Sequence, residues 1–254
     1  MSKEKTTDDL SNHKLSSLKK INTFLDSLIS SGDLKKQGKS DKLCYWLEDW
    51  TTFLEFESNF SPINLRRYKR GEIIKVHLGF NVGSEEGGLH YAVVIDKQNA
   101  KSSPVLTIIP LTSVKPHTNI EKLKKGSIFL GNELFTNLSS KISMVDRNLK
   151  SEIEELHKLI GDLENNYSIE QSTIIKTKLV DAEKELSLLN KMRKEVLKMK
   201  SGSIALVNQI TTISKIRIYD PKTDHDIMSG IKLSNEKLDM IDNEIKINFT
   251  NLQN

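Results

Sequence analysis

A pair of apolar repeats between residues 145 and 200 is the feature that most constrains how this chain can fold. The first repeat has a 4-3-4-3 spacing and consists of Leu149, Ile153, Leu156, Ile160 and Leu163. The second has the same spacing and consists of Ile175, Leu179, Ala182, Leu186 and Leu189. Such spacing gathers apolar side chains on one face of an α-helix, as in coiled coils. We therefore predict an inserted antiparallel coiled-coil hairpin over residues 145–200, with a capping box at Ser168 and Gln171 starting its second helix.

Short β-branched runs lie on both sides of this insertion. They occupy residues 72–78, 91–96, 105–111 and 127–130 before it, and 203–207 and 215–218 after it. Short strands separated by turn residues predict a small β-barrel. Residues 239–249 are predicted to form a C-terminal helix. The hairpin thus interrupts one β-domain, made of residues 68–144 and 201–254.

The first 67 residues are predicted to be a separate helical extension. One apolar stripe contains Leu15, Leu18, Ile21, Leu25 and Leu28, and a second contains Leu43, Leu47, Trp50 and Leu54. Ser40 or Asp41 is the expected cap of the second helix, because short polar side chains accept the first free backbone N–H groups. Residues 1–10 are expected to be disordered.

Composition excludes several classes of protein. A single cysteine, Cys44, excludes a disulfide scaffold and a cysteine-based zinc site, and the six histidines lack zinc-ligand spacing. We expect no cofactor. No apolar run approaches about 18 residues, and the polar start resembles no signal peptide, so we expect a cytoplasmic protein without a membrane span. Residues 68–140 carry nine basic and six acidic groups, which suits an anionic ligand there and equally suits random scatter.

Four segments resemble the MazF/PemK (Kid) family of toxin endoribonucleases, in the family's order. The first two run Arg-Gly-Glu-Ile-Ile-Lys-Val over 70–76 and Gly-Ser-Glu-Glu-Gly-Gly-Leu-His-Tyr-Ala-Val-Val-Ile over 83–95. The later two are Ser-Pro-Val-Leu-Thr-Ile-Ile-Pro-Leu-Thr-Ser over 103–113 and the stretch 202–217. The resemblance covers about 68–135 and 202–250, near half of the chain, and leaves out both helical additions.

The resemblance implies an α+β fold, in which a small SH3-like β-barrel carries a C-terminal helix. It also implies a homodimeric toxin of a type II toxin–antitoxin system, which cleaves single-stranded RNA or mRNA at short sequences without a metal. Its implied partners are that RNA and a cognate antitoxin, in a toxin–antitoxin complex that can include operator DNA.

Metal-free RNA cleavage uses the ribose 2′-OH as nucleophile and requires a base, an acid and donors for the phosphorane charge. The resemblance places the family's catalytic Thr at Thr112, with Ser113 beside it, and places the family's Arg at His90. An imidazole titrates near neutrality, whereas a guanidinium gives up protons poorly. His90 is therefore a candidate acid or base; alternatively, the loss of Arg weakens or abolishes catalysis, or His90 is structural.

Further site residues follow from the same resemblance. Glu85 is a candidate secondary base; otherwise its glycine-rich loop is a flexible lip that contacts RNA. Gln209 is expected to hold the barrel near the site. The predicted RNA-binding residues are Arg70, Lys75, Ser84, Gly87, Gly88, Ser113, Lys115 and Gln209, with Arg70, Lys75 or Lys115 supplying positive charge.

Two alternatives to a ribonuclease remain at this stage. In one, the barrel keeps its shape but has lost the reaction, and the protein binds nucleic acid or a partner as a regulatory module. In the other, the helices form an oligomerisation scaffold and the barrel is incidental.

Overall fold

A computed structural model describes residues 5–165, 169–199 and 202–251 of the chain. The chain divides into two compact units, Met1–Ser58 and Asn59–Asn254. This division lies before the predicted boundary at residue 67. The reason is that Leu65 packs against a core of the second unit, and Arg66 forms ion pairs with Glu72 and Asp224 of that unit.

The first unit contains two helices, α1 (Thr7–Ile29) and α2 (Leu34–Glu57). Thr6 and Asp9 form a capping box that starts α1 at Thr7, so the predicted disorder of residues 1–10 is wrong from that residue on. Residues 1–4 lie outside the described part. Asp33 caps α2, so the predicted caps Ser40 and Asp41 are wrong, since both lie inside the helix.

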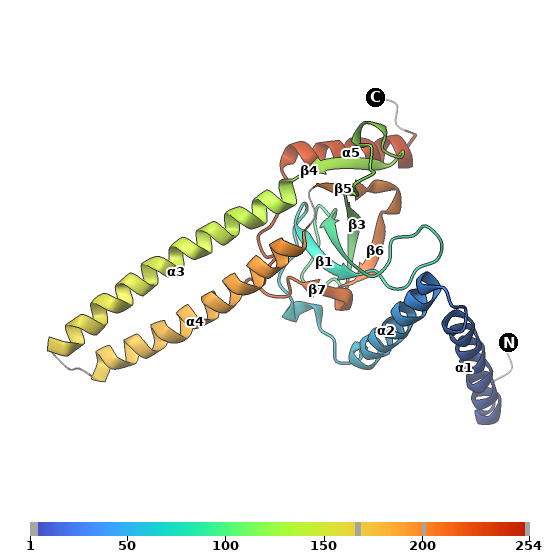
Figure 1. The fold of residues 1–254 in the computed structure, drawn as a ribbon, viewed down its shortest axis with the longest axis horizontal. Coiled ribbons are helices and arrows are strands. Elements are labelled where there is room, and N and C mark those ends of the chain that lie inside the picture. The colour runs from blue at the N-terminus through green and yellow to red at the C-terminus, as the bar shows by residue number, and fades with distance from the viewer. Residues whose placement is uncertain (1–4, 166–168, 200–201, 252–254) are drawn as a thin grey trace. The chain divides into compact units, whose positions relative to one another are not determined.

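The second unit is built on an antiparallel sheet, which gives the chain a mixed α+β fold (Figure 1). Its strands are β1 (Ile73–His77), β2 (Leu89–Val94), β3 (Val105–Ser113), β4 (Ser127–Gly131), β5 (Ser203–Leu206), β6 (Thr211–Ser214) and β7 (Ile218–Asp220). The strand order is β4-β5-β3-β2-β1-β7, and β6 pairs with the first half of β3. Among the described residues no pairing joins β4 to β7, so the sheet is not closed.

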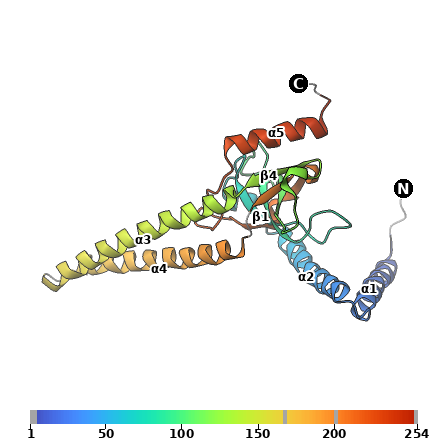
Figure 2. The same cartoon turned by 45° about the horizontal axis from the view of Figure 1, so that its top comes forward.

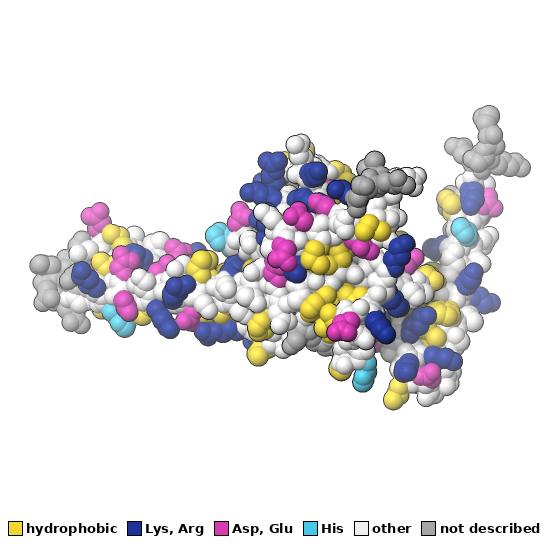
Figure 3. Space-filling model, turned by 90° about the horizontal axis from the view of Figure 1, so that it is seen from above, with side chains coloured by type: hydrophobic (Ala, Val, Ile, Leu, Met, Phe, Trp, Pro, Cys, Tyr) yellow, Lys and Arg dark blue, Asp and Glu magenta, His cyan; other side chains and the backbone are white. Residues whose placement is uncertain are grey.

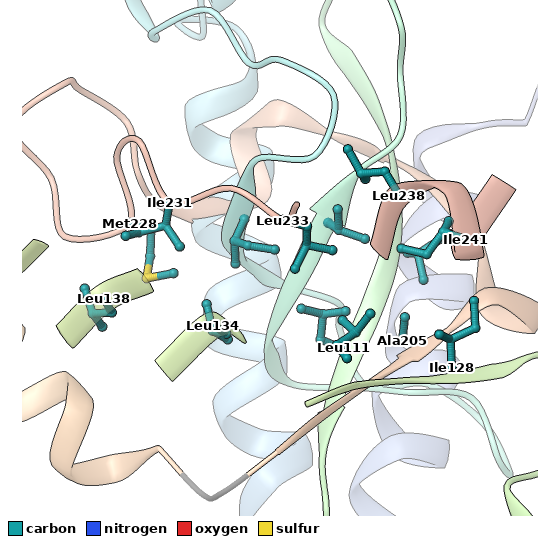
Figure 4. Packing of buried hydrophobic residues seen from close by; sticks show 14 of the residues in the cluster. Leu111, Ile128, Leu134, Leu138, Ala205, Met228, Ile231, Leu233, Leu238 and Ile241 are labelled. Carbon is teal, nitrogen blue, oxygen red and sulfur yellow. The ribbon is translucent and has the colours of Figure 1, made fainter. Parts of the chain in front are cut away.

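Both faces of the central strands are buried, which explains why residues 91–95 read as a continuous apolar run rather than an alternating one. Ile73, Val93 and Ile109 point into one core, which also contains residues from α3, from the 228–233 segment and from α5 (Asn235–Phe249) (Figure 4). Ile74 and Ala92, their neighbours in sequence, point into a second core with Ile213 of β6 and Ile218 of β7. The predicted strand 215–218 is instead a 3₁₀ turn over Lys215–Arg217, and β7 begins at Ile218.

The insertion forms two antiparallel helices, α3 (Glu133–Asn165) and α4 (Ile169–Lys198), which extend together away from the sheet (Figures 1 and 2). Their seam buries Leu149, Leu156, Ile175, Ala182 and Leu189. α3 begins well before the predicted residue 145, because its first turns bury Leu134 and Leu138 in the sheet's core. Ser168 and the side chain of Leu163 lie outside the described part. No described helix is long and apolar enough to cross a bilayer.

Candidate active site

A cleft of about 410 Å³ opens at one edge of the second core. It lies between the glycine-rich loop that joins β1 to β2 and the segment that joins β5 to β6. Its polar lining residues are Asn81, Glu85, Glu86, Asn208, Gln209, Thr211 and Arg217, and its apolar ones are Leu78, Pro110, Ile210 and Ile213. The cleft therefore brings together parts of the chain that lie on opposite sides of the inserted hairpin.

Gln209 holds the glycine-rich loop in place. Its Oε1 accepts a hydrogen bond from the backbone N–H of Glu86 at 2.6 Å, and its Nε2 donates to the carbonyl oxygen of Ser84 at 3.2 Å. These two bonds attach the loop to the 3₁₀ turn Val207–Gln209, which joins β5 to β6. Ser84 contributes its backbone carbonyl to this contact rather than its hydroxyl, and the predicted roles of both residues at an RNA site stay predictions.

Gly87 and Gly88 are each suited to the loop for a different structural reason. A Cβ on Gly87 would lie 2.8 Å from the carbonyl oxygen of Gly79, so that position has room only for hydrogen. Gly88 has φ +83°, in the left-handed region that side chains disfavour. Its N–H donates to the Gly79 carbonyl, and the Leu78 N–H donates to the Gly88 carbonyl, both at 2.7 Å. The loop thus returns tightly onto the end of β1.

His90 lies on β2 directly after this loop and pairs across β1 with Val76. Its Nδ1 lies 3.2 Å from the carbonyl oxygen of Leu111, and its Nε2 lies 3.8 Å from the Glu86 carboxylate. Because a carbonyl oxygen only accepts hydrogen bonds, this contact assigns the proton to Nδ1. Nε2 is then the nitrogen without a proton, and it faces the Glu86 carboxylate.

Thr112 and Ser113 lie at the end of β3, and strand alternation sends their side chains to opposite faces. In the antiparallel pair of β2 and β3, Tyr91 lies opposite Leu111. If this register continues by one residue, His90 lies opposite Thr112. Side chains directly opposite each other share a face of the sheet. Ser113 faces the other way and lines a small cavity of about 60 Å³ at the base of the hairpin.

Arg217 is a cleft residue that the sequence reasoning did not select. It lines the cleft, and its Nε donates to the His77 carbonyl at 2.8 Å. Burial lowers the pKa of Arg217 below its usual value. The signal was present in the sequence, since Arg217 ends the last family-like segment, but residue type alone gave no reason to prefer it over Arg70 or Lys75.

Arg70 does not line the cleft. Its guanidinium pairs with the Asp242 carboxylate on α5 and donates to the carbonyl oxygen of Ile95. These contacts attach the C-terminal helix to the end of β2. Arg70 therefore stabilises the packing of α5 on the domain. Its predicted contact with RNA stays a prediction.

Lys75 forms an ion pair with the inserted hairpin. Its ammonium pairs with the Glu195 carboxylate of α4, which also accepts the Tyr91 hydroxyl. Burial disfavours the charged form of Glu195, but hydrogen bonds from Lys75 and Tyr91 prevail and lower its pKa. Burial first, and then Glu195, raises the pKa of Tyr91. Lys75 and Tyr91 together therefore form a polar anchor for the hairpin.

The other predicted residues remain on the surface. Glu85 lines the cleft, and its carboxylate accepts the N–H of Val82 at 3.3 Å, within its own loop. Lys115 follows β3, and its backbone N–H donates to the Thr118 hydroxyl at 3.0 Å. The carboxylate beside His90 is Glu86, the neighbour of the predicted Glu85. Within the described ranges, no three His, Cys, Asp or Glu side chains form a group that could hold a metal ion.

Residues 69–166 match the family described as PemK-like, MazF-like toxin of type II toxin–antitoxin system. The match confirms the resemblance over its first three segments and includes the loop, His90, Thr112 and the whole of α3. It ends before β5, although β5, β6 and β7 complete the sheet that β1–β4 begin. A search of curated proteins found no match.

Proposed function

We propose that this chain, whose residues 69–166 match the family of PemK-like, MazF-like type II toxins, is an endoribonuclease that cleaves single-stranded RNA without a metal. The observation that carries this proposal is the position of His90. Its Nδ1 contacts the Leu111 carbonyl, and its Nε2 faces the carboxylate of Glu86, a residue that lines the cleft.

The proposed reaction begins when His90 Nε2 takes the proton of a ribose 2′-OH. The 2′-oxygen attacks the adjacent phosphorus, the bond to the 5′-oxygen breaks, and the products carry a 2′,3′-cyclic phosphate and a 5′-OH. Glu86 stabilises the imidazolium that forms, in the way that a carboxylate orients and supports a catalytic histidine elsewhere. Protonated His90, or water, then returns the proton to the leaving oxygen.

Positive charge for the phosphorane comes from Arg217, because it is the cleft residue with a guanidinium. Its Nε bond to the His77 carbonyl holds the group in one orientation before substrate binds, which favours transition-state stabilisation. The Thr112 hydroxyl, on the same face as His90, is the proposed donor to a non-bridging oxygen. Glu85, which lines the cleft from the glycine-rich loop, is a proposed contact to the bases or sugar of the RNA.

Several finer features belong to the same proposal. The sheet curls around the second core in the manner of an SH3-like barrel, and the hairpin packs as a coiled coil. The protein acts in the cytoplasm as a homodimer, and a cognate antitoxin silences it, alone or on operator DNA. The family match supports the barrel, the homodimer and the antitoxin. The buried seam between α3 and α4 supports the coiled coil.

A binding module without cleavage is the competing function, and one observation favours it. The cleft carries two carboxylates, Glu85 and Glu86, against the single guanidinium of Arg217, which repels phosphate more than the predicted basic surface would.

One experiment decides between the two functions. Purified protein is incubated with a long single-stranded RNA in EDTA, and the new 5′ ends are mapped. Cleavage at a short recurrent sequence supports the ribonuclease. Salt-dependent RNA binding without any new end contradicts it and supports the binding module.

A further inference from the structure

The loop that joins β3 to β4, residues 114–126, is strongly basic and is called the basic loop below. Its exposed basic residues are Lys115, Lys122, Lys124 and Lys125. They stand against one acidic residue, Glu121, which gives the loop a surplus of three positive charges. Residues 68–140 as a whole carry nine basic and six acidic groups, so the basic loop accounts for the entire excess of that segment. The positive charge is therefore concentrated rather than scattered.

The lysines of the basic loop are available to bind an anion. In the described part of the chain, none of their four ammonium groups forms an ion pair or a hydrogen bond. By contrast, Arg70 and Lys75, two other basic residues of the domain, pair with Asp242 and Glu195. A paired cation must leave its carboxylate before it can bind another anion, whereas an unpaired one attracts the anion directly.

Both ends of the basic loop adjoin the proposed site. The loop begins after Ser113, next to Thr112, whose hydroxyl is the donor to phosphate in the proposed reaction. It ends at Gly126, whose carbonyl oxygen accepts the backbone N–H of Asn208 at 3.2 Å. Asn208 lines the cleft. A Cβ on Gly126 would lie 2.7 Å from the Cβ of Asn208, so the loop and the cleft meet as closely as glycine allows.

Hydrogen bonds within the basic loop order its backbone. Asn119 Oδ1 accepts the N–H of Glu121 at 3.0 Å and starts a short 3₁₀ turn there. The N–H of Ser127 donates to the carbonyl oxygen of Lys124 at 3.0 Å, which closes a turn at the other end. A loop that is already ordered loses less conformational entropy when it binds a ligand.

The cleft by itself is short of positive charge. It carries Glu85 and Glu86 against the guanidinium of Arg217. The hairpin shows charges of both signs with hydrophobic side chains between them (Figure 3), so it presents no uniformly basic surface on that face. RNA carries a negative charge at every phosphate, and its binding depends on neutralising several of them. An RNA strand that enters the cleft therefore needs a basic surface beside it.

We propose that the basic loop binds the phosphate backbone of single-stranded RNA on the Asn208 side of the cleft. Contacts between ammonium groups and phosphates position a strand without reading its sequence. The loop contains no Phe, Tyr or Trp, so it contributes charge rather than base stacking. The inference rests on the proposed function for the identity of the ligand, and it concerns binding rather than the reaction.

Salt-dependent binding of an RNA that cannot be cleaved tests the proposal in the full chain. The probe is a single strand of about 20 nucleotides with 2′-O-methyl riboses, longer than the site sizes of about 4–16 nucleotides of single-strand binders. The loop variant combines Lys122→Gln, Lys124→Gln and Lys125→Gln. The control variant removes the same charge from exposed positions of α4 and combines Lys176→Gln, Lys191→Gln and Lys194→Gln.

We expect the loop variant to bind this RNA at least tenfold more weakly than the control variant. The slope of log affinity against log salt should fall by about two, because each phosphate contact contributes about 0.7 in single strands. Equal affinities and slopes in the two variants overturn the proposal. Loss of polyglutamate binding with unchanged RNA binding also overturns it, because the loop then serves an acidic protein partner.

Cleavage of unmodified RNA separates this proposal from the proposed reaction. We expect the loop variant to raise KM and to leave kcat unchanged, because its lysines hold the strand outside the reacting atoms. A wild type that binds the modified RNA through the basic loop but cleaves no RNA contradicts the ribonuclease and still supports the loop. A loop variant that lowers kcat at the wild-type KM overturns the binding role.

Discussion

The side chain of Gln209 and the backbone of Glu86, 123 positions apart in the sequence, form a 2.6 Å hydrogen bond across the cleft. The bond joins the segment after the hairpin to the loop before it, and Glu86 is also the carboxylate that faces His90. The position of Glu86 beside the imidazole therefore depends on Gln209.

Gln209→Ala should release the glycine-rich loop. Removal of two hydrogen bonds leaves the N–H of Glu86 without its side-chain acceptor, and we expect the free energy of unfolding to fall by about 1–2 kcal/mol. Hydrogen exchange at the Glu86 amide should accelerate. Asn208→Ala, in the same cleft, is the control and should leave that amide unchanged. Equal protection of the Glu86 amide in both variants would show that Gln209 does not hold the loop.

Gly87→Ala should distort the loop by steric collision. The added Cβ would lie 2.8 Å from the Gly79 carbonyl oxygen, a backbone atom that moves only with the strand end. We expect a loss of about 1–3 kcal/mol in the free energy of unfolding. Gly38→Ala, in α2 with no neighbour within 4 Å, should instead stabilise by up to about 1 kcal/mol. Urea unfolding of the two variants checks both signs.

Attachment of the hairpin to the sheet should depend on pH through Glu195. The pKa of Glu195 is lower in the folded protein than in the unfolded chain, so its stabilisation is fully present above the usual Glu value of about 4.3. It is lost as the pH falls through the folded value. We expect Glu195→Gln to reduce the free energy of unfolding by about 1–3 kcal/mol at pH 7.

The difference between wild type and Glu195→Gln should shrink as the pH falls below about 4. Glu183→Gln, on the exposed face of α4, is the matched control. A difference that stays constant from pH 7 to pH 3 would contradict a charged anchor at Lys75.

Arg217 and Arg70 should have separable effects on RNA binding. Arg217 lines the cleft, whereas Arg70 pairs with Asp242 on α5. We expect Arg217→Gln to weaken RNA binding and to reduce the slope of log affinity against log salt by about one. Arg70→Gln should mainly lower thermal stability and leave the slope unchanged. The reverse assignment of the two effects would place the RNA on the α5 side of the domain.

Local patterns predicted most of the elements, because the evidence for each is contained in neighbouring residues. The apolar spacing at Leu149–Leu163 indicated a helix, and the run 91–96 indicated a buried strand. Helix starts were less predictable: Asp33 and Ser40 are both acceptable caps, and the choice between them depends on packing. Glu133–Met144 was assigned to the β-domain because its tertiary burial, through Leu134 and Leu138, is invisible in periodicity.

The site was predictable only where a motif fixed the backbone. The family-like loop identified His90 and the glycines, and Gln209 was expected near the site. Ion-pair partners from distant segments could not be predicted. Lys75 and Arg70 were expected to bind RNA, but in the fold they form ion pairs with Glu195 and Asp242 respectively. Arg217 lines the cleft instead because the 3₁₀ turn before β7 brings it beside His77. Ion pairs of this kind depend on the three-dimensional arrangement of the chain, and the number of charged residues in a segment does not predict them.

Cleavage of single-stranded RNA in EDTA by wild type and by His90→Ala is the most direct test of the proposed reaction. Wild type should produce fragments with 2′,3′-cyclic phosphate and 5′-OH ends. His90→Ala, shown by circular dichroism to be folded, should cleave about 10²–10⁴-fold more slowly, while His157→Ala on the hairpin should cleave at the wild-type rate. Intact RNA with wild type, or equal rates for wild type and His90→Ala, would contradict a catalytic role for His90.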